Sequence, residues 1–259
     1  MGGSISVPLE LCDLLADSDW ALAHFTLAAD VTVLRNRCRF ACSEHGLAVR
    51  YDGLPFAAMA FWGENPSDVA RLVAELVKAD EPFYLVVSAH QAELAAGVFD
   101  VEHVDAEWQL CFDGDAGCLD ARGAVGLVSA DLPAMQCLAA DAGLMALEAD
   151  PFRYGPAFGV WASDHGGSLR HLASMAATRL QLPGAAEIGN VATHCEYRRR
   201  GLARTVVSAL VQAHVDNGQR VFLMVFQTND AAVHLYRDMG FVCRRPMYLM
   251  QCKVRPAAT

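Results

Sequence analysis

The sequence predicts an α/β (α+β) protein built from two lobes. Its 259 residues exceed the usual size of a single domain, so one large or two modest domains are expected. Helical and strand-like patterns alternate in both halves of the chain, and a stretch rich in glycine and aspartate, residues 113–123, lies between them. A hydrophobic content of 54%, with 19% charged residues, supplies enough apolar side chains for a core. We therefore expect one domain over residues 1–120 and another over residues 121–259.

The first lobe is predicted to begin with helices and to continue with strands and further helices. The segment Asp17-Ser18-Asp19 stands where the first helix should break, and it is predicted to cap the second helix, because such side chains accept hydrogen bonds from the N–H groups that open a helix. The expected elements, in chain order, are helices over residues 7–15 and 20–34, short strands between residues 39 and 62, a helix capped by Asn65, a strand over residues 83–88, a helix near residues 91–97 and a strand near residues 107–112.

The second lobe is predicted to begin with a helix that the segment Ser129-Ala130-Asp131-Leu132-Pro133 caps, with Pro133 in its first turn. A hairpin follows, with a turn across residues 164–167. The remaining expected elements are hairpin strands over residues 158–163 and 169–180, a strand from Glu187 to Thr193, an amphipathic helix that begins at Leu202 and ends at Asn217-Gly218, and a buried strand over residues 221–226.

A turn rich in arginine, Arg198-Arg199-Arg200-Gly201, connects the strand ending at Thr193 to the helix beginning at Leu202. A strand that enters a glycine-containing turn and opens a helix aims unpaired backbone N–H groups, and the positive end of the helix dipole, at one point. The arginines add a cationic field. These residues therefore predict a binding site for a phosphate group, and favour a ligand with more than one negative charge.

Two segments resemble signatures of the GNAT superfamily of N-acetyltransferases. Arg198-x-x-Gly201-x-Ala203 is similar to the loop Gln/Arg-x-x-Gly-x-Gly/Ala with which that family binds the pyrophosphate of acyl-CoA. Asn229 to Phe241 is similar to the second signature, Asn-x-x-Ala-x-x-x-Tyr-x-x-x-Gly-Phe, with the alanine displaced by one residue. The resemblance covers residues 157–253. It implies that each lobe is a mixed, mostly antiparallel sheet flanked by helices.

The first half has the same order of helices and strands, so it resembles a degenerate copy of the same unit. Where a phosphate loop should open its central helix, the chain has Asn65-Pro66-Ser67-Asp68. This is an ordinary helix cap with an acidic first turn, which would repel a pyrophosphate. We therefore predict a degenerate GNAT-like domain over residues 1–120 and the catalytic GNAT domain, with the one cofactor site, over residues 121–259.

The resemblance also implies which residues bind acetyl-CoA, the acyl donor. Gly201 would let the phosphates approach the backbone, which a side chain there would prevent. The strand before the turn would pair its backbone with the amides of pantetheine. The predicted cofactor-binding residues are Val191, Ala192, Thr193, Arg198, Arg199, Arg200, Gly201, Leu202, Ala203, Arg204, Asn229 and Tyr236.

Two residues are candidates for the chemistry that the resemblance implies. Tyr236 occupies the position of the general acid that protonates the departing CoA thiolate, and the alternative is a tyrosine that only packs the helix against the sheet. Glu187 starts the central strand and resembles the glutamate that deprotonates the amine directly or through water; the alternative is a glutamate at the rim with no catalytic part. No metal is needed for this reaction. A non-catalytic acyl-CoA-binding or regulatory module remains the alternative for the whole chain.

Charge and composition bear on location and partners. The net charge is −10; residues 1–125 carry 20 acidic and 7 basic side chains, and residues 126–259 carry 10 and 13. This balance disfavours nucleic acid as a partner. Without a membrane-length apolar segment, and with nine cysteines that show no paired spacing, we expect a cytoplasmic protein with reduced thiols. The expected partner is an amine acceptor, a small molecule or a peptide, and two lobes leave a homodimer possible.

Overall fold

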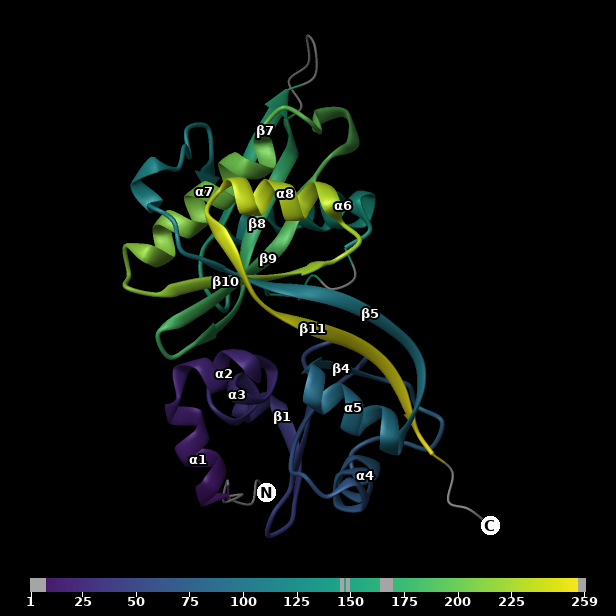
Figure 1. Ribbon diagram of the computed structural model, residues 1–259. Coiled ribbons are helices and arrows are strands. Elements are labelled where there is room, and N and C mark those ends of the chain that lie inside the picture. Colours follow the sequence, from purple (N-terminus) through teal and green to yellow (C-terminus); the bar gives the residue numbers. More distant parts are fainter. Residues whose placement is uncertain (1–7, 145–146, 148–149, 164–169, 256–259) are drawn as a thin grey trace. The chain divides into compact units, whose positions relative to one another are not determined.

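The computed structural model describes residues 8–144, 147, 150–163 and 170–255 (Figure 1). The chain folds into two compact units. Unit 1 comprises Met1–Trp108, Phe226–Thr228 and Arg245–Thr259, and unit 2 comprises Gln109–Val225 and Asn229–Arg244. Each unit contains a mixed sheet with helices against it, as the fold class predicted.

Unit 1 is built around strands whose order is β1-β2-β3-β4-β11-β5. The pairs β1–β2, β2–β3 and β4–β11 are antiparallel, and the pair β3–β4 is parallel. The elements are α1 (Leu9–Ala16), α2 (Ser18–Ala23), α3 (Phe25–Val31), η1 (Arg35–Arg37), β1 (Cys38–Cys42), β2 (Leu47–Tyr51), β3 (Ala57–Trp62), α4 (Pro66–Ala74), β4 (Phe83–Ser88), α5 (Ala89–Val98) and β5 (Phe99–Phe112).

Two capping segments predicted for this unit, residues 17–19 and the one that contains Asn65, are confirmed. The Asp17 side chain accepts from the N–H groups of Asp19 at 2.8 Å and Trp20 at 3.1 Å, and Asn65 accepts from Asp68 at 3.1 Å. The single helix predicted for residues 20–34 is wrong, because α2 ends and α3 begins at His24, whose φ and ψ are −120° and 38°. Sequence periodicity does not detect such a break, since the apolar pattern continues across it.

The core of unit 1 lies on both faces of its sheet. On one face α1 and α3 contribute Leu11, Leu27 and Val31, which pack with residues of β2 and β3. On the other face α4 contributes Val69, Leu72 and Val73 to a larger cluster. Because successive residues of a strand point to opposite faces, Ala48 joins the second cluster while its neighbours Leu47 and Val49 join the first.

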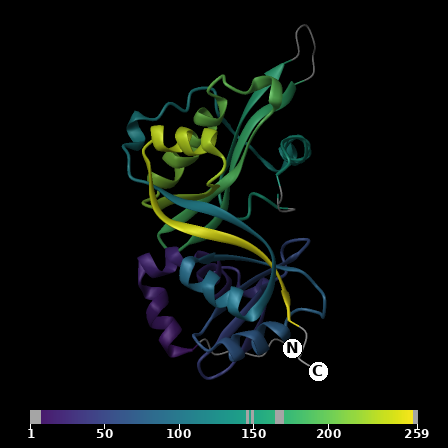
Figure 2. The same cartoon turned by 45° about the vertical axis from the view of Figure 1, so that its right-hand side comes forward.

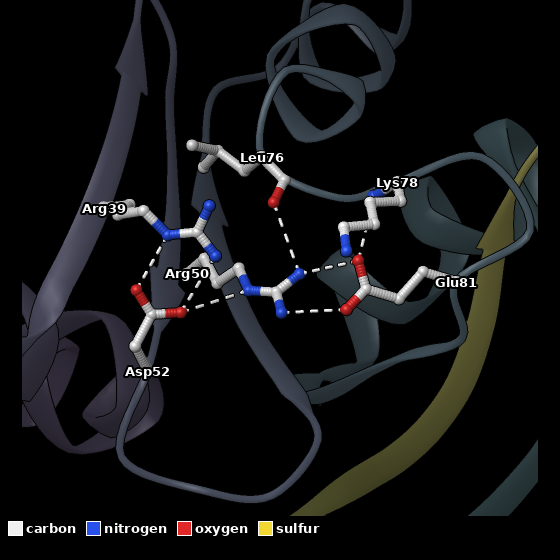
Figure 3. Close-up of polar contacts among 6 residues, drawn as sticks. All are labelled: Arg39, Arg50, Asp52, Leu76, Lys78 and Glu81. Atoms are coloured by element: carbon white, nitrogen blue, oxygen red, sulfur yellow. Dashed lines mark hydrogen bonds and ion pairs between the residues drawn. The ribbon is translucent and has the colours of Figure 1, made fainter.

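An ion-pair network joins the hairpin of β1 and β2 to the segment that leads into β4 (Figure 3). Arg50 donates to both carboxylate oxygens of Glu81 at 2.8 Å and to the carbonyl of Leu76 at 3.3 Å. Asp52 accepts from Arg39 through two bonds of 2.7 and 2.9 Å, and from Arg50 Nε at 3.2 Å. Arg50 therefore holds residues that are far apart in the sequence, and its own charge is fully compensated.

Unit 2 has the strand order β10-β9-β8-β7-β6. Its pairs are antiparallel except for β9 and β10, which are parallel. The elements are η2 (Ala116–Cys118), β6 (Val125–Gly126), η3 (Ser129–Asp131), α6 (Leu132–Ala142), β7 (Ala157–Ser163), β8 (Arg170–Leu182), β9 (Ala185–Thr193), η4 (Cys195–Tyr197), α7 (Leu202–Val215), β10 (Arg220–Phe226) and α8 (Asp230–Asp238).

The last strand, β11 (Phe241–Val254), was not among the predicted elements. It begins in unit 2, and its residues Met247–Cys252 pair with Ser88–Phe83 of β4 in unit 1. In the views of Figures 1 and 2, β11 runs beside β5, its neighbour in the sheet order. Both strands contribute residues to each unit.

The helices of unit 2 cover both faces of its sheet. The α6 helix packs on β8 and β9, and α7 packs on β7, β8 and β9. The segment predicted to cap α6 contains its N-cap residue, Asp131, and Pro133 lies in the first turn as predicted. Ser129 lies in the short 3₁₀ helix before it, and the side chain of Asp131 accepts from the N–H of Val128 at 2.8 Å. Gly218, with φ of +71°, follows the end of α7 as predicted. The predicted turn over residues 164–167 lies outside the described residues.

None of the helices in the described part of the chain has the length and apolar character needed to span a lipid bilayer.

Candidate active site

The parallel strands β9 and β10 of unit 2 pair only at their beginnings. The register joins Ala185 to Arg220, Ala186 to Val221 and Glu187 to Phe222, and it ends there. Both strands continue, to Thr193 and to Phe226. The backbone groups of β9 beyond Glu187 that face away from β8 are therefore not paired with β10, and an extended ligand can use them.

A bulge in β9 lies within this open part. Met175 of β8 pairs with Ala192 and Ala177 pairs with Gly189, so two residues of β9, Asn190 and Val191, stand opposite one residue of β8. Asn190 has a φ of +50°, which is uncommon for a residue other than glycine. Such a bulge bends the strand and changes the direction of the side chains and amides that follow.

The three predicted pantetheine-binding residues do not face the same side of β9. The N–H of His194 donates to Ala173 of β8 at 2.9 Å, and the hydroxyl of Ser174 donates to the carbonyl of Ala192 at 3.0 Å. Because backbone groups alternate along a strand, Ala192 bonds toward β8, whereas Val191 and Thr193 bond toward the open side. The carbonyl of Thr193 accepts from Arg198 Nε at 3.3 Å.

The turn predicted to bind phosphate has a backbone that few residue types can adopt. Arg199 and Gly201 have φ of +63° and +81°, and Gly201 caps α7. Apart from Gly201 itself and its two neighbours in the chain, no heavy atom of the described residues lies within 4 Å of the position that a Cβ on Gly201 would take. The space beside the turn is thus open on the side where a ligand would approach.

Backbone donors gather at this turn. Among the described residues, no acceptor is found for the N–H groups from Arg199 to Arg204, and no side chain caps α7. The first hydrogen bond of the helix runs from the N–H of Thr205 to the carbonyl of Gly201, at 3.1 Å. Exposed N–H groups at a helix start, together with the positive end of its dipole, form a site for an anion.

The arginines of the turn are held in different ways. Arg200 donates to the carbonyl of Glu196 at 2.9 Å, and its guanidinium lies 4.9 Å from the centre of the Tyr197 ring. Arg204 donates to the carbonyl of Asp238 at 3.4 Å and lies 3.9 Å from its carboxylate. Arg199 is exposed and makes no polar contact with the described residues. The turn therefore keeps at least one arginine uncommitted.

The helix α8 carries Asn229 and Tyr236. Asn229 caps it, because its side chain accepts from the N–H of Ala232 at 3.2 Å. The contact of Arg204 with Asp238 fixes the end of α8 beside the start of α7. Tyr236 is 7% exposed, and its ring lies 5.7 Å from that of Phe241. Burial raises the pKa of Tyr236 to about 12, so its phenol keeps its proton at neutral pH.

Glu187 is the buried acid of the site. It is 2% exposed, and burial raises the pKa of its carboxyl, while Arg179 at 3.6 Å lowers it. Arg179 is placed by a second irregularity: Thr178 pairs with Ile188 and Leu180 pairs with Glu187, so Arg179 has no partner residue in β9. A carboxylate with this balance of burial and charge is a better proton acceptor than an exposed one.

Unit 1 has a counterpart of the parted strands that is closed by its own side chains. Here β3 and β4 are parallel and pair at three positions, from Ala57 with Phe83 to Met59 with Leu85. Beyond them, the carbonyl of Phe61 accepts from the side chain of Gln91, a buried residue of α5, at 3.0 Å. The helix that follows β3 is capped by Asn65. Among the described residues of unit 1, at least one backbone group beyond the paired positions is therefore already occupied by a side chain of the unit itself.

The sequence reading did not single out Ser174, Arg179 or Asp238. Each contacts a predicted site residue on a neighbouring element. Ser174 donates to the carbonyl of Ala192, Arg179 lies beside the carboxyl of Glu187, and Asp238 lies beside the guanidinium of Arg204. These contacts depend on the register of the strands and on the packing of the helices, which the spacing of the residues in the sequence does not reveal. Only the polar character of Ser174 and Arg179 inside a mostly apolar strand, Arg170–Leu182, could have drawn attention to them.

Comparison with known proteins agrees with this geometry. Residues 166–249 match the family model of FR47-like proteins. A putative acetyltransferase of the GNAT family from Novosphingobium aromaticivorans is 26% identical, with a TM-score of 0.70, over 91% of this chain and 99% of that one. A GCN5-related N-acetyltransferase from Kribbella flavida is 16% identical, with a TM-score of 0.63, over 90% and 96%. No curated protein matches the sequence significantly.

A two-lobed relative is also found. A tandem GNAT protein from the clavulanic acid biosynthesis pathway has a TM-score of 0.59 and 14% identity, over 97% of this chain and 98% of that one. Its similarity shows that the present fold, over both units, is one that tandem GNAT proteins have. With the FR47-like match in the region of the parted strands and the turn, these findings confirm the resemblance seen in the sequence: the chain is similar in fold to acetyltransferases of the GNAT superfamily over both units, and in sequence to FR47-like proteins over residues 166–249.

Proposed function

We propose that the protein is an N-acetyltransferase that moves an acetyl group from acetyl-CoA to an amine, with its site in unit 2. One observation carries the proposal. The strands β9 and β10 part after Glu187 and Phe222, and the turn at the end of β9 offers N–H groups without internal acceptors beside the open space at Gly201. That arrangement suits a ligand with a diphosphate at one end and an extended amide chain at the other.

The residues around the turn fit this donor. The N–H groups from Arg199 to Arg204 would bind the diphosphate, with the guanidinium of Arg199 adding charge. The outward-facing groups of Val191 and the N–H of Thr193 would bind the pantetheine amides, whereas the carbonyl of Thr193 already accepts from Arg198. Ala192 would contribute less than the sequence suggested, since its carbonyl already accepts from Ser174. Asn229 would lie near the donor at the start of α8.

Two buried groups would move the protons. The amine attacks the thioester carbonyl, and a C–N bond forms while the C–S bond breaks. Glu187, directly or through water, would take the proton that the amine loses, which its raised pKa favours. Tyr236 would give its proton to the departing thiolate. Since the thioester is already activated, positioning of the amine would supply much of the rate.

Acetyl-CoA binding and turnover test the proposal together. Isothermal titration with acetyl-CoA should give saturable binding with one site per chain. An acetyl-transfer screen over small amines, amino acids, peptide N-termini and lysine side chains, followed by release of free thiol, should identify an acceptor. If acetyl-CoA shows no saturable binding, the proposal is wrong.

A non-catalytic acyl-CoA-binding module is the second candidate, and the burial of both proton carriers favours it. Glu187 is 2% and Tyr236 is 7% exposed, so the acceptor amine would need access to a carboxyl, and the departing thiolate to a phenol, that water scarcely reaches. The same screen separates the two candidates. Saturable binding without thiol release for any amine class would support the module and exclude the enzyme.

A further inference from the structure

Arg179 of β8 lies beside the buried acid of the candidate active site. Its Nη1 is 3.6 Å from Oε1 of Glu187, which is too far for a hydrogen bond, and no hydrogen bond from its guanidinium is found in the described part of the chain. The side chain of Arg179 is 46% exposed, whereas that of Glu187 is 2% exposed. Five N–H donors of a permanently charged group are therefore available to a ligand that reaches Glu187.

Two features of the sheet place Arg179 there. It has no partner residue in β9, because the register of the two strands shifts between Thr178 and Leu180. Gly189 shares a face of β9 with Glu187, and a Cβ at Gly189 would lie 3.2 Å from Cδ and 3.5 Å from Cβ of Arg179. The stem of Arg179 thus occupies the space that a side chain at position 189 would need. The absence of that side chain lets the guanidinium lie next to Glu187.

The two side chains present opposite charges close together. Glu187 is negative when it acts as a base, and Arg179 is always positive. In a free α-amino acid, a single carbon atom separates the amine nitrogen from the carboxylate carbon, so both groups of the zwitterion fit beside such a pair. The amine then faces Glu187, and the guanidinium binds the carboxylate through two parallel N–H···O bonds. An amine without a carboxylate uses only half of this arrangement.

We propose that the acceptor is a free α-amino acid, whose carboxylate binds the guanidinium of Arg179 while its amine lies beside Glu187. This inference rests on the proposed function, because it names the acceptor of that reaction. The amine attacks the thioester carbonyl, the C–N bond forms and the C–S bond breaks. Of the two protons that the ammonium loses, one replaces the proton that Tyr236 gives to the thiolate, and the other passes to water.

The same pair disfavours the other classes of amine. A peptide N-terminus has an amide in place of the carboxylate, and the side chain of a lysine in a protein has no carboxylate beside its amine. With such an acceptor in the site, the donors of Arg179 lose water without gaining an anionic partner. A diamine brings a second ammonium toward the guanidinium, and the like charges repel each other.

Acetyl transfer to L-alanine and to L-alaninamide tests the assignment. The amide keeps the amine and the methyl group and removes only the carboxylate charge. Because a carboxylate stabilises the ammonium beside it, alanine has less free amine at neutral pH, so alaninamide should be the better acceptor in the absence of a carboxylate site. Release of free thiol should nevertheless give L-alanine a kcat/KM at least about tenfold higher than that of the amide. Glycine, serine and phenylalanine, each with its amide, extend the comparison to other side chains.

Replacement of Arg179 shows whether its guanidinium causes this preference. R179Q should abolish the preference, chiefly through a higher KM for the amino acids, and R179K should restore part of it, because an ammonium keeps the charge without the paired donors. Any change in the basicity of Glu187 affects both acceptors, so the ratio of their kcat/KM values isolates the carboxylate contact. R244Q is the matched control and should keep the ratio, because Arg244 is 45% exposed in the same unit and lies 4.0 Å from the carboxylate of Asp113.

A pair of glycine variants tests the placement of Arg179 without removing its charge. G189A should reduce the ratio, since the added methyl group displaces the stem of Arg179. G126A should not, because, apart from its neighbours in the chain, no heavy atom of the described residues lies within 4 Å of the added Cβ.

The possible results distinguish this inference from the proposed function. Equal or higher kcat/KM for the amides, an unchanged ratio in R179Q, or transfer to another class of amine with none to amino acids would overturn the amino acid as acceptor and leave the acetyltransferase in place. If no amine of any class released thiol from acetyl-CoA, the proposed function itself would be wrong.

Discussion

Glu187 of β9 and Phe222 of β10 form the last pair between two parallel strands that both continue beyond it. The buried carboxyl of the proposed reaction thus stands at the position where the strands separate. Glu187 is buried, which raises the pKa of its carboxyl. The same residue marks the position where β9 separates from β10 and its backbone becomes open to a ligand. A donor bound along β9 would bring its thioester toward this residue.

Gly201 and Gly218 offer a matched test of the phosphate site. Both have a positive φ, of +81° and +71°, both have open space where a Cβ would lie, and they lie beyond opposite ends of α7. G201D and G218D should each lose about 1 kcal/mol of stability from the strained backbone. Only G201D should weaken acetyl-CoA binding, by at least about tenfold, since its carboxylate would face the diphosphate. Equal affinities for the two variants in isothermal titration would argue against the turn as the binding site.

Replacing Tyr236 by phenylalanine tests the general acid. The ring and its contact with Phe241 are kept, so the fold and the affinity for acetyl-CoA should hardly change. Turnover should fall by about a hundredfold if the phenol protonates the thiolate. Because the pKa of Tyr236 is about 12, its ionisation should produce no loss of rate below about pH 11 in the unaltered enzyme. Y197F, which removes another hydroxyl and keeps its ring, should retain full turnover.

The influence of Arg179 on Glu187 should appear in the pH dependence of kcat/KM. Glu187 must be deprotonated to act as base, so the rate falls on the acidic side of its pKa. Arg179 lowers that pKa against the effect of burial, and R179Q should therefore move the acidic limb to higher pH. E187Q should lower turnover and abolish the limb. An unchanged limb in R179Q, with turnover retained in E187Q, would assign the base to another group.

The order and type of most elements could be predicted from the sequence because each has a local signal. Capping residues such as Asp17 and Asn229 mark helix starts, and alternating or continuous apolar runs mark strands such as Phe83–Ser88. The turn at Gly201 could be predicted as an anion site because glycine and arginines there conflict with an ordinary helix start. The division into domains at residue 120 and the roles of the site residues remain predictions.

What the sequence could not reveal depends on contacts between distant segments. The pairing of β11 with β4 joins residues near the end of the chain to residues 83–88, and nothing local specifies such a partner. The bulge at Asn190 follows from the register of β8 against β9. The same register directs the backbone groups of Ala192 toward β8 and away from the open side of β9. The bond from Gln91 to Phe61, which closes the counterpart site in unit 1, requires the packing of α5 on β3.

Asp30 should make unit 1 less stable as the pH rises. It is 1% exposed, burial raises the pKa of its carboxyl to about 8, and a hydrogen bond with Cys38 partly opposes this. In the unfolded chain the carboxyl loses its proton near its ordinary pKa of 3.8, so between about pH 4 and pH 8 the folded state binds more protons and stability declines with pH. The decline approaches about 1.4 kcal/mol per pH unit at most.

The D30N variant removes this titration. Its advantage in the free energy of unfolding, measured by urea denaturation from pH 5 to pH 9, should grow with pH and become constant above about pH 8. Parallel curves for the variant and the unaltered protein would mean that Asp30 is ionised in the fold throughout this range.

Arg50 and Glu81 should give the opposite dependence (Figure 3). The side chain of Arg50 lowers the pKa of Glu81 to about 2, and the N–H of Lys78 adds to this effect. A lowered folded-state pKa stabilises the fold above about pH 4.5, and that contribution is lost as the pH falls toward 2.

The R50Q variant should therefore lose about 1–2 kcal/mol of stability at pH 7, and the difference from the unaltered protein should shrink as the pH falls below 4.5. R71Q is the control, because Arg71 is 53% exposed and pairs with Asp68 and Glu75 on the surface of α4, where such pairs contribute less than about 1 kcal/mol. If urea denaturation gave R50Q and R71Q the same small loss at pH 7, the network around Arg50 would be no stronger than an ordinary surface pair. A larger loss for R50Q that vanishes in acid would tie the stability to the charge of Glu81, because packing by the Arg50 side chain does not depend on pH.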